Sequence, residues 1–438
     1  MPTVTSLAGR CVRPAVLSLR RPAMAATLDN PPTPSSSGGE RLHGLDAVRG
    51  YALMLGVIFH ATMSFMPGYP VWMVTDTHRT PVLGAVFFVS HIFRMTTFFL
   101  IAGFFARMTF HKRGARAWAI DRAKRIALPL VVFWPILIAG IAVASGYAVY
   151  VATGVFPTKG PPQPPAPPLS FPLTHLWFLY LLLWLYTGTL IVRGLTAKLD
   201  KGGRVRAGVD RIVAGLVGSP LAPIALAIPA AAVFALTPSW LVWFGTPTPD
   251  MNLIPNVPAA VEFSVAFGFG WLLQRQMGLL AKLRERWALN LAAAVALTVG
   301  LLVALGASPV VTPDKSDLTR LAHAAAYALA IWTWTFAAIG MGLKFLNNHS
   351  PARRYIADSS YWIYLIHLPL VIFLQAAVSR LDWPWEAKFA VVIGVGFALM
   401  FASYELLVRH TFIGAMLNGR RVPWRKPTAT PGPLETAR

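Results

Sequence analysis

Residues 126–158 read IALPLVVFWPILIAGIAVASGYAVYVATGVFPT and contain no Asp, Glu, Lys or Arg. A helix needs about 20 apolar residues to cross the hydrocarbon core of a bilayer, so this stretch is long enough to span a membrane. Three further uncharged stretches meet the same test, namely 160–192, 212–249 and 287–313. The chain is therefore predicted to be an integral membrane protein.

The composition supports this prediction and excludes other classes of protein. Of the 438 residues, 55% are hydrophobic and only 13% are charged, with a mean hydropathy of +0.56. Soluble domains carry about 25% charged residues, and disordered chains lack this much apolar surface. The single cysteine, Cys11, excludes an internal disulfide and a cysteine-based metal site. No metal and no bound cofactor are expected.

The hydropathy pattern predicts an all-α fold, a polytopic bundle of about ten transmembrane helices. Their expected boundaries, to within about 2–4 residues, are 44–66, 82–106, 126–150, 173–193, 221–245, 259–279, 287–306, 323–345, 359–379 and 388–409.

Charge alternates between the two sides of this predicted bundle. The chain has 39 Lys and Arg against 17 Asp and Glu, and the basic residues gather in the loops near 107–125, 198–211, 282–286 and 353–354. Short basic loops stay in the cytoplasm, so both termini are predicted to be cytoplasmic. Topology and contact with anionic membrane lipids then account for most of the net charge of +22. We find no nucleic-acid-binding module, so no nucleic-acid partner is expected.

The two ends of the chain differ from the apolar middle. Residues 1–43 include the stretch PPTPSSSGG at 31–39 and are predicted to be a disordered cytoplasmic tail, with Met24 as an alternative start to Met1. Residues 44–410 form the predicted membrane domain. Residues 411–438 are predicted to be a cytoplasmic C-terminal tail.

Charged residues inside the first span mark a candidate site. Arg49 and His60 are eleven positions apart, which is three helical turns plus about 20°, so they share one helix face about 16 Å apart along the axis. Asp46 falls near the same face, so the three residues form a polar stripe along the predicted helix. Ionisable residues within a membrane usually face a polar interior. A histidine there suits general acid–base catalysis, although a hydrogen-bonded packing role is the alternative.

Arg94 lies about twelve residues into the second span, too deep to reach the membrane surface easily. It is predicted to point into a polar interior, with Glu262 as a candidate counterion. Arg122 and Arg125 are three positions apart at the inner boundary of the third span. They share a helix face that could bind phosphates, or they could only anchor the topology.

The fourth span opens with HLWFLY at 175–180. Its aromatic residues could form an ordinary interfacial belt. A histidine beside a tryptophan could also hold a sugar, whose C–H face packs on an aromatic ring.

Several of these pieces, in this order, resemble the membrane acyltransferase-3 family. They are RLHGLDAVRG at 41–50 leading to His60, the Arg-x-x-Arg pair at 122 and 125, and SYWIYLIHLP at 360–369. Within the family, IFRMTTFFLIAGFF at 92–105 and HLWFL at 175–179 are similar to the glucan biosynthesis protein C branch, which is associated with succinylation of periplasmic glucans. The resemblance covers about 41–410, and it departs from the branch at Thr96 and Thr97, where proline is frequent.

The resemblance implies that 44–410 is an acyltransferase domain in the bacterial inner membrane. It would move an acyl group, succinyl or acetyl, from cytoplasmic acyl-CoA to a hydroxyl of a periplasmic or cell-envelope glucan or other carbohydrate. The co-substrate is then acyl-CoA, and the expected partners are membrane lipids, acyl-CoA and the carbohydrate acceptor.

Residue roles follow as hypotheses from the two lines of reasoning together. The expected catalytic residues are His60, as general base or acyl carrier, and Arg49, which would position the donor or stabilise negative charge that develops near the thioester. The other expected roles are Arg122 and Arg125 for the CoA phosphates, Arg94, His175 and Trp177 for the acceptor, and Asp46, His367 and Glu405 as supporting residues.

Two other functions fit parts of the sequence. A transporter or flippase of an anionic metabolite or lipid-linked sugar would also need ten spans and buried charges, but it would be favoured by paired broken helices that we do not see in the sequence. A non-catalytic sensor leaves the ordered basic and histidine motifs unexplained.

Overall fold

The computed structural model describes residues 42–158, 169–419 and 422–423. Within these ranges the chain is helical, and its only β pairing is a single bridge between Ser170 and Asn252. Nearly all of the predicted N-terminal tail and most of the predicted C-terminal tail lie outside the described residues.

The α-helices follow one another along the chain as α1 (His43–Thr62), α2 (Pro81–Arg113), α3 (Ala115–Arg122), α4 (Leu128–Thr153), α5 (Trp177–Leu199), α6 (Arg204–Gly218), α7 (Ala222–Ala235), α8 (Val257–Leu273), α9 (Leu280–Glu285), α10 (Trp287–Leu305), α11 (Asp317–Phe345), α12 (Pro351–Val378), α13 (Trp385–Ser403) and α14 (Phe412–Asn418). Short 3₁₀ segments lie between them at η1 (Met63–Phe65), η3 (Thr174–Leu176), η4 (Val242–Phe244) and η5 (Met277–Leu279), and two π-helical segments are η2 (Ala123–Ala127) and η6 (Tyr404–Arg409).

The predicted all-α membrane bundle is confirmed. In the described part of the chain, eight helices are long and apolar enough to cross a membrane, or up to ten if each of two bent helix pairs counts as one span. Eight of the ten predicted spans coincide with one of the straight helices. The first lies in α1 and η1, for example, and the last in α13 and η6.

The two remaining predicted spans are bent rather than straight. The fifth was expected at 221–245, but α7 ends at Ala235 and meets α6 at 108°. Pro220 stands at this corner, where it lacks an N–H donor and restricts the residue before it. The sixth was expected at 259–279, but α8 ends at Leu273, and the helical segment that follows meets it at 111°. Arg275 pairs with Asp210 at 2.5 Å and so joins the second corner to α6.

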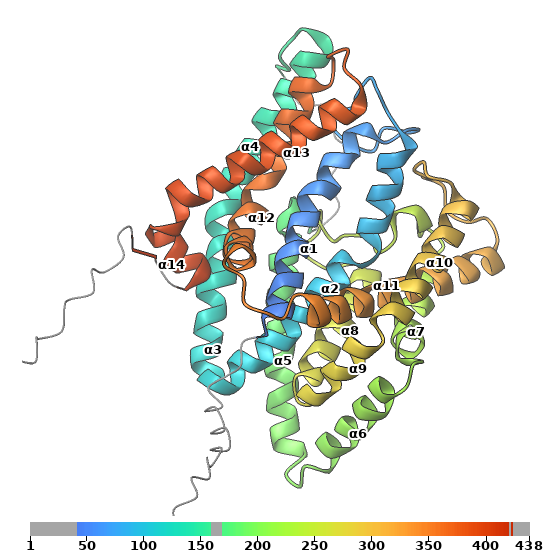
Figure 1. Ribbon diagram of the computed structural model, residues 1–438, viewed down its shortest axis with the longest axis vertical. Helices are drawn as coiled ribbons and strands as arrows, with labels where there is room; N and C mark the ends of the chain where they lie inside the picture. The colour runs from blue at the N-terminus through green and yellow to red at the C-terminus, as the bar shows by residue number, and fades with distance from the viewer. Residues whose placement is uncertain (1–41, 159–168, 420–421, 424–438) are drawn as a thin grey trace, which may run out of the picture. The chain divides into compact units, whose positions relative to one another are not determined.

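Helix α1 lies in the middle of the bundle. It packs against α2, α11, α12 and α13, while α4 packs on the far side of α12 and α10 on the far side of α11 (Figure 1). Leu45, Val57 and Ala61 of α1 are buried in these contacts. Because α1 has helices on several sides, a polar stripe along it faces protein rather than lipid.

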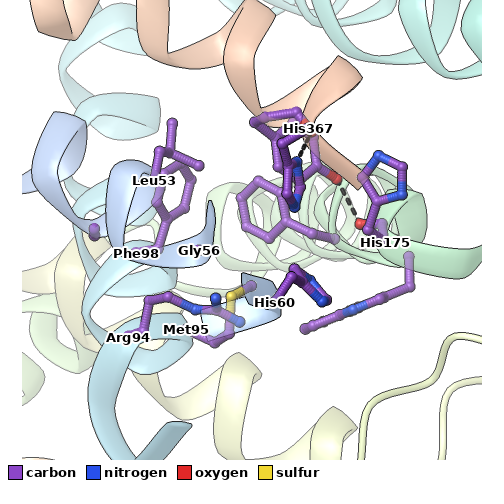
Figure 2. A pocket seen from close by; sticks show the side chains of 12 residues that line it. Leu53, Gly56, His60, Arg94, Met95, Phe98, His175 and His367 are labelled. Atoms are coloured by element: carbon purple, nitrogen blue, oxygen red, sulfur yellow. Dashed lines mark hydrogen bonds between the residues drawn. The ribbon is translucent and has the colours of Figure 1, made fainter. Parts of the chain in front are cut away.

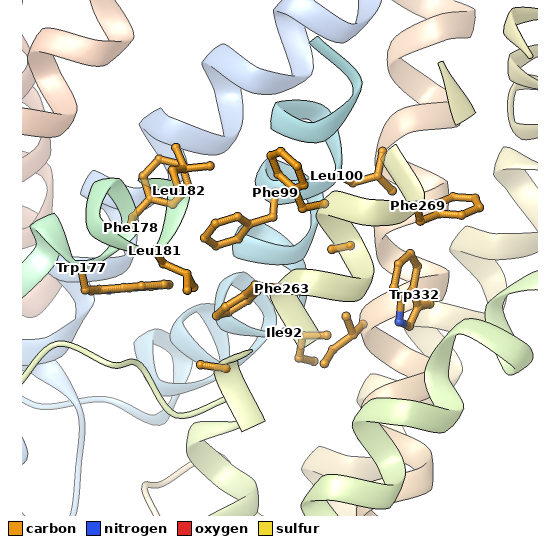
Figure 3. Packing of buried hydrophobic residues seen from close by; sticks show 14 of the residues in the cluster. Ile92, Phe99, Leu100, Trp177, Phe178, Leu181, Leu182, Phe263, Phe269 and Trp332 are labelled. Carbon is orange, nitrogen blue, oxygen red and sulfur yellow. The ribbon is translucent and has the colours of Figure 1, made fainter. Parts of the chain in front are cut away.

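Aromatic side chains fill the space between α2, α5, α8 and α11 (Figure 3). The ring of Phe99 on α2 stacks on Phe263 of α8 at 4.6 Å between centroids. The backbones of these two helices also touch, since a Cβ at Gly103 or at Gly270 would collide with a carbonyl oxygen of the other helix. Small residues at such crossings are typical of packed transmembrane helices. This rigid contact fixes the position of α2, which carries Arg94.

Candidate active site

A narrow cavity lies beside the C-terminal half of α1 (Figure 2). Its volume is about 50 Å³, well below the roughly 300 Å³ or more of typical ligand pockets. Substrates must therefore move side chains to enter it. Four parts of the bundle line it, with Ala52, Leu53, Gly56 and His60 from α1, Arg94, Met95 and Phe98 from α2, His175, Trp177 and Phe178 from η3 and α5, and Tyr364 and His367 from α12.

The imidazoles of His60 and His367 face each other across this cavity, with 5.1 Å between their centroids. Nδ1 of His367 lies 2.7 Å from the carbonyl oxygen of Tyr364. Since a carbonyl can only accept, Nδ1 carries a proton, and Nε2 has a free lone pair when the ring is neutral. That Nε2 is buried without a hydrogen-bond partner in the described residues, as is Nδ1 of His60.

His175 joins η3 to α12 through two hydrogen bonds. Its Nε2 donates to the carbonyl of Leu365 at 2.9 Å, and its own carbonyl accepts from the Tyr364 hydroxyl at 2.7 Å. The ring also lies 5.1 Å from that of His367. Both bonds hold the segment of α12 that presents His367, so His175 is placed to position that residue. Trp177, which follows in α5, packs on Phe263 at 5.5 Å and lines the cavity.

Arg94 is the cation of the cavity. Its guanidinium lies over the ring of Phe59, 4.2 Å from the centroid, and in the described residues it forms no hydrogen bond or ion pair. Gly56 provides room for it, because a Cβ there would lie 3.2 Å from Nη1 of Arg94. A buried charge without a partner is costly, so this guanidinium is suited to bind an anionic group of a substrate.

Glu262 is not the counterion of Arg94. Its Oε1 accepts a hydrogen bond from Thr96 at 3.0 Å, and Thr97 donates to Thr335 at 3.2 Å. The two threonines at which the chain departs from the glucan branch thus connect α2 to α8 and α11. Helical periodicity does not show that Thr96 would bind this carboxylate.

A second polar group lies at the other end of the α1 stripe. Arg49 pairs with Asp46 at 3.4 Å and lies over the ring of Phe105. Arg122 pairs with Asp121 and lies over the ring of Tyr186, 5.9 Å from its centroid. Arg49 is thus about 16 Å along the helix from His60.

Arg125 shares Asp121 with Arg122, whereas Glu405 lies elsewhere. Arg125 contacts Asp121 at 2.9 Å and lines a separate, largely apolar groove between α4 and α14. Glu405 pairs with Arg409 at 2.8 Å and accepts a hydrogen bond from Tyr355. Neither residue lines the cavity at His60.

Two residues beside His60 were missing from the sequence-based prediction. Trp72, in the loop after α1, lies 5.7 Å from the His60 ring and donates to the side chain of Gln375 at 2.9 Å. Gln375 is an amide within an otherwise apolar span, and that signal was available in the sequence. Among the described residues, no group of three His, Cys, Asp or Glu side chains is arranged to hold a metal ion.

The matched family decides the class of protein. A family model described as an acyltransferase domain matches residues 42–404. The chain belongs to this family, membrane acyltransferase-3. It is therefore an acyl-transferring membrane enzyme, and the resemblance inferred from the motifs is confirmed.

Several curated relatives of this acyltransferase are described as glucans biosynthesis protein C. The protein from Shigella dysenteriae serotype 1 is 23% identical over 396 residues, which is 90% of this chain and 98% of the relative. Those from Escherichia coli strain SMS-3-5 and Salmonella typhimurium are also 23% identical, over 90% and 91% of this chain and 98% and 100% of their own lengths. No solved structure matches the chain significantly.

Proposed function

We propose that this acyltransferase moves a succinyl or acetyl group from cytoplasmic acyl-CoA to a hydroxyl of a periplasmic or cell-envelope glucan. One observation carries the proposal: a buried cavity holds two facing histidines and an unpaired arginine, and the helix that contributes His60 also carries Arg49. The names of the relatives support glucan as the acceptor class.

The donor would enter from the end of the bundle that carries the basic loops, which the charge pattern predicts to be cytoplasmic. Arg122, together with Arg125 at the rim, would bind the CoA phosphates, since guanidinium groups match phosphate geometry. Arg49 would position the pantetheine arm. The thioester would then extend along α1 toward His60.

The chemistry at His60 is an acyl transfer. The acceptor hydroxyl oxygen attacks the thioester carbonyl carbon while His60 takes the hydroxyl proton. The C–S bond then breaks, the new C–O ester bond remains, and His60 returns the proton to the thiolate sulfur to give CoA. In a second form of the mechanism, a His60 nitrogen attacks the thioester carbonyl, the C–S bond breaks, and CoA leaves as the thiol with the imidazole proton. The acceptor hydroxyl then attacks the acyl-imidazole, the C–N bond breaks to leave the ester, and the imidazole takes the hydroxyl proton.

Neighbouring residues support this step. The free Nε2 lone pair of His367 accepts a hydrogen bond from the protonated imidazole of His60. Arg94 binds a carboxylate, such as that of a succinyl group, or the oxyanion that forms at the carbonyl. His175 positions α12, and Trp177 lines the part of the cavity that would receive the acceptor.

Mass spectrometry of cell-envelope glycans tests the proposal. Strains with and without the gene are compared, and the deletion is complemented with the wild-type gene and with His60→Ala. The proposal expects a succinyl or acetyl substituent that disappears on deletion and returns only with the wild type. Identical glycans in all strains would refute it.

A further inference from the structure

The loop between η1 and α2 is fixed to the bundle by buried polar contacts. Lys388 of α13 pairs with Asp76 of this loop at 2.8 Å, and both side chains are almost fully buried, at 0% and 1% exposed. The Asp76 amide also donates to the carbonyl of Ser64 at 2.9 Å, and the Thr80 amide to that of Phe65 at 2.9 Å. A buried ion pair is strongly destabilised when one partner is lost, so these contacts hold the loop in one place.

Trp72 is the residue that this loop places beside His60. Its indole Nε1 donates to Oε1 of Gln375 at 2.9 Å, and Nε2 of Gln375 donates to the carbonyls of His60 and Ala61 at 2.9 and 3.1 Å. These partners determine the amide orientation, because the carbonyls need a donor and the indole needs an acceptor. Gln375 therefore positions Trp72 relative to the last turn of α1.

Part of the Trp72 side chain remains exposed, while the rest packs against an apolar cluster that includes Ile141 of α4 and Ile372 of α12. The indole N–H is occupied by Gln375, the ring is only partly buried, and its plane is tilted 32° from that of His60. Trp72 does not line the cavity that contains Arg94 and Phe98. It approaches His60 from the loop that follows α1, which is the end of this helix away from Arg49 and the predicted donor entry.

We infer that Trp72 is the stacking platform for a pyranose ring of the acceptor, and that Gln375 is its positioning residue. This inference rests on the proposed function. The apolar C–H face of a sugar packs on an aromatic face, and a ring centred on Trp72 places its hydroxyls next to the imidazole of His60. The same contact selects a carbohydrate over a small alcohol, because only a ring covers the indole.

The test compares Trp72→Ala and Trp72→Phe with wild type in the purified full-length protein. Trp383→Ala is the matched control, because Trp383 is a half-exposed tryptophan in the loop before α13. The acceptor KM and kcat are measured with labelled acyl-CoA and a glucose oligosaccharide, together with CoA release without acceptor. Binding of the same oligosaccharide is measured separately, without acyl-CoA. Thermal unfolding shows whether each variant is folded.

The inference expects Trp72→Ala to raise both the acceptor KM and the oligosaccharide Kd by about 10-fold or more, as for other stacking contacts. Trp72→Phe should recover part of the loss, and CoA release and Trp383→Ala should stay close to wild type. Unchanged KM and Kd, or a fall in kcat alone, would overturn it. If wild type transfers no acyl group but binds the oligosaccharide through Trp72, the proposed function fails and the platform stands.

Discussion

The imidazole of His60 on α1 lies 5.1 Å from that of His367 on α12, although the two residues belong to the first and ninth predicted spans. His367 also contacts His175, which is bonded to α12 through Leu365 and Tyr364. Three segments distant in sequence therefore meet at one cavity. The arrangement brings a histidine from near each end of the chain to one cavity.

His367 should act through its Nε2 atom. A glutamine side chain can place a polar group near the Nε2 position, whereas asparagine reaches only the Nδ1 position and keeps the bond to Tyr364. We expect His367→Gln to keep about 10-fold more acyl transfer than His367→Asn, within the range of acid–base contributions. Steady-state kcat of the two purified variants checks this. Equal losses would indicate that only packing around His367 matters.

Arg94 should select for an anionic acyl group or substrate. Charge-assisted hydrogen bonds contribute about 1.5–3 kcal/mol, so Arg94→Gln should lower kcat/KM for succinyl-CoA by about 10-fold to 100-fold, and for acetyl-CoA by less. Competition between the two labelled donors measures the ratio directly. A loss of the same size for both donors would assign Arg94 to the oxyanion or to the acceptor instead.

Arg122 should bind the nucleotide end of the donor. Its guanidinium pairs with Asp121 and lies over the ring of Tyr186. Arg122→Ala should weaken CoA binding by about 10-fold, the loss expected for a charge-assisted contact to phosphate. The control is Arg116→Ala, an exposed arginine one helical turn or more away on α3. Isothermal titration with CoA measures both, and equal affinities would leave Arg122 as a topology anchor.

The contact between α2 and α8 should be sensitive to a single methyl group. A Cβ at Gly270 would collide with the carbonyl of Leu100, whereas one at Gly268 on the same helix would meet open space. Overpacking costs about 1–3 kcal/mol, so Gly270→Ala should lower the Tm in detergent and Gly268→Ala should not. Scanning fluorimetry checks the pair. Equal Tm values would mean that α2 and α8 accommodate the added methyl group without loss of stability.

Helical periodicity was sufficient to predict the α1 stripe, because Asp46, Arg49 and His60 are on one continuous helix. It could not predict the bend between α6 and α7, since the apolar run after Ser219 and Pro220 has the length of one span whether or not the chain bends. Nor could it pair Glu262 with Thr96. That choice depends on how α2 and α8 pack, which follows from contacts such as that at Gly270.

The predicted phosphate pair was placed only in part by its spacing. Arg122 and Arg125 both pair with Asp121, but Arg122 also lies over the ring of Tyr186, whereas Arg125 lines the groove between α4 and α14. Trp72 could not be placed by periodicity at all. It lies in a loop, and only the contacts of Gln375 and Lys388 bring that loop to the end of α1.

The most direct test of the central claim is acyl transfer by the purified protein with labelled succinyl-CoA or acetyl-CoA and a glucan acceptor. Wild type should form the labelled ester and release CoA, and His60→Ala should lower the rate by about 10²-fold to 10⁴-fold while keeping its Tm. His349→Ala, an exposed histidine in the loop before α12, serves as the control and should be fully active. Normal transfer by His60→Ala would contradict the account.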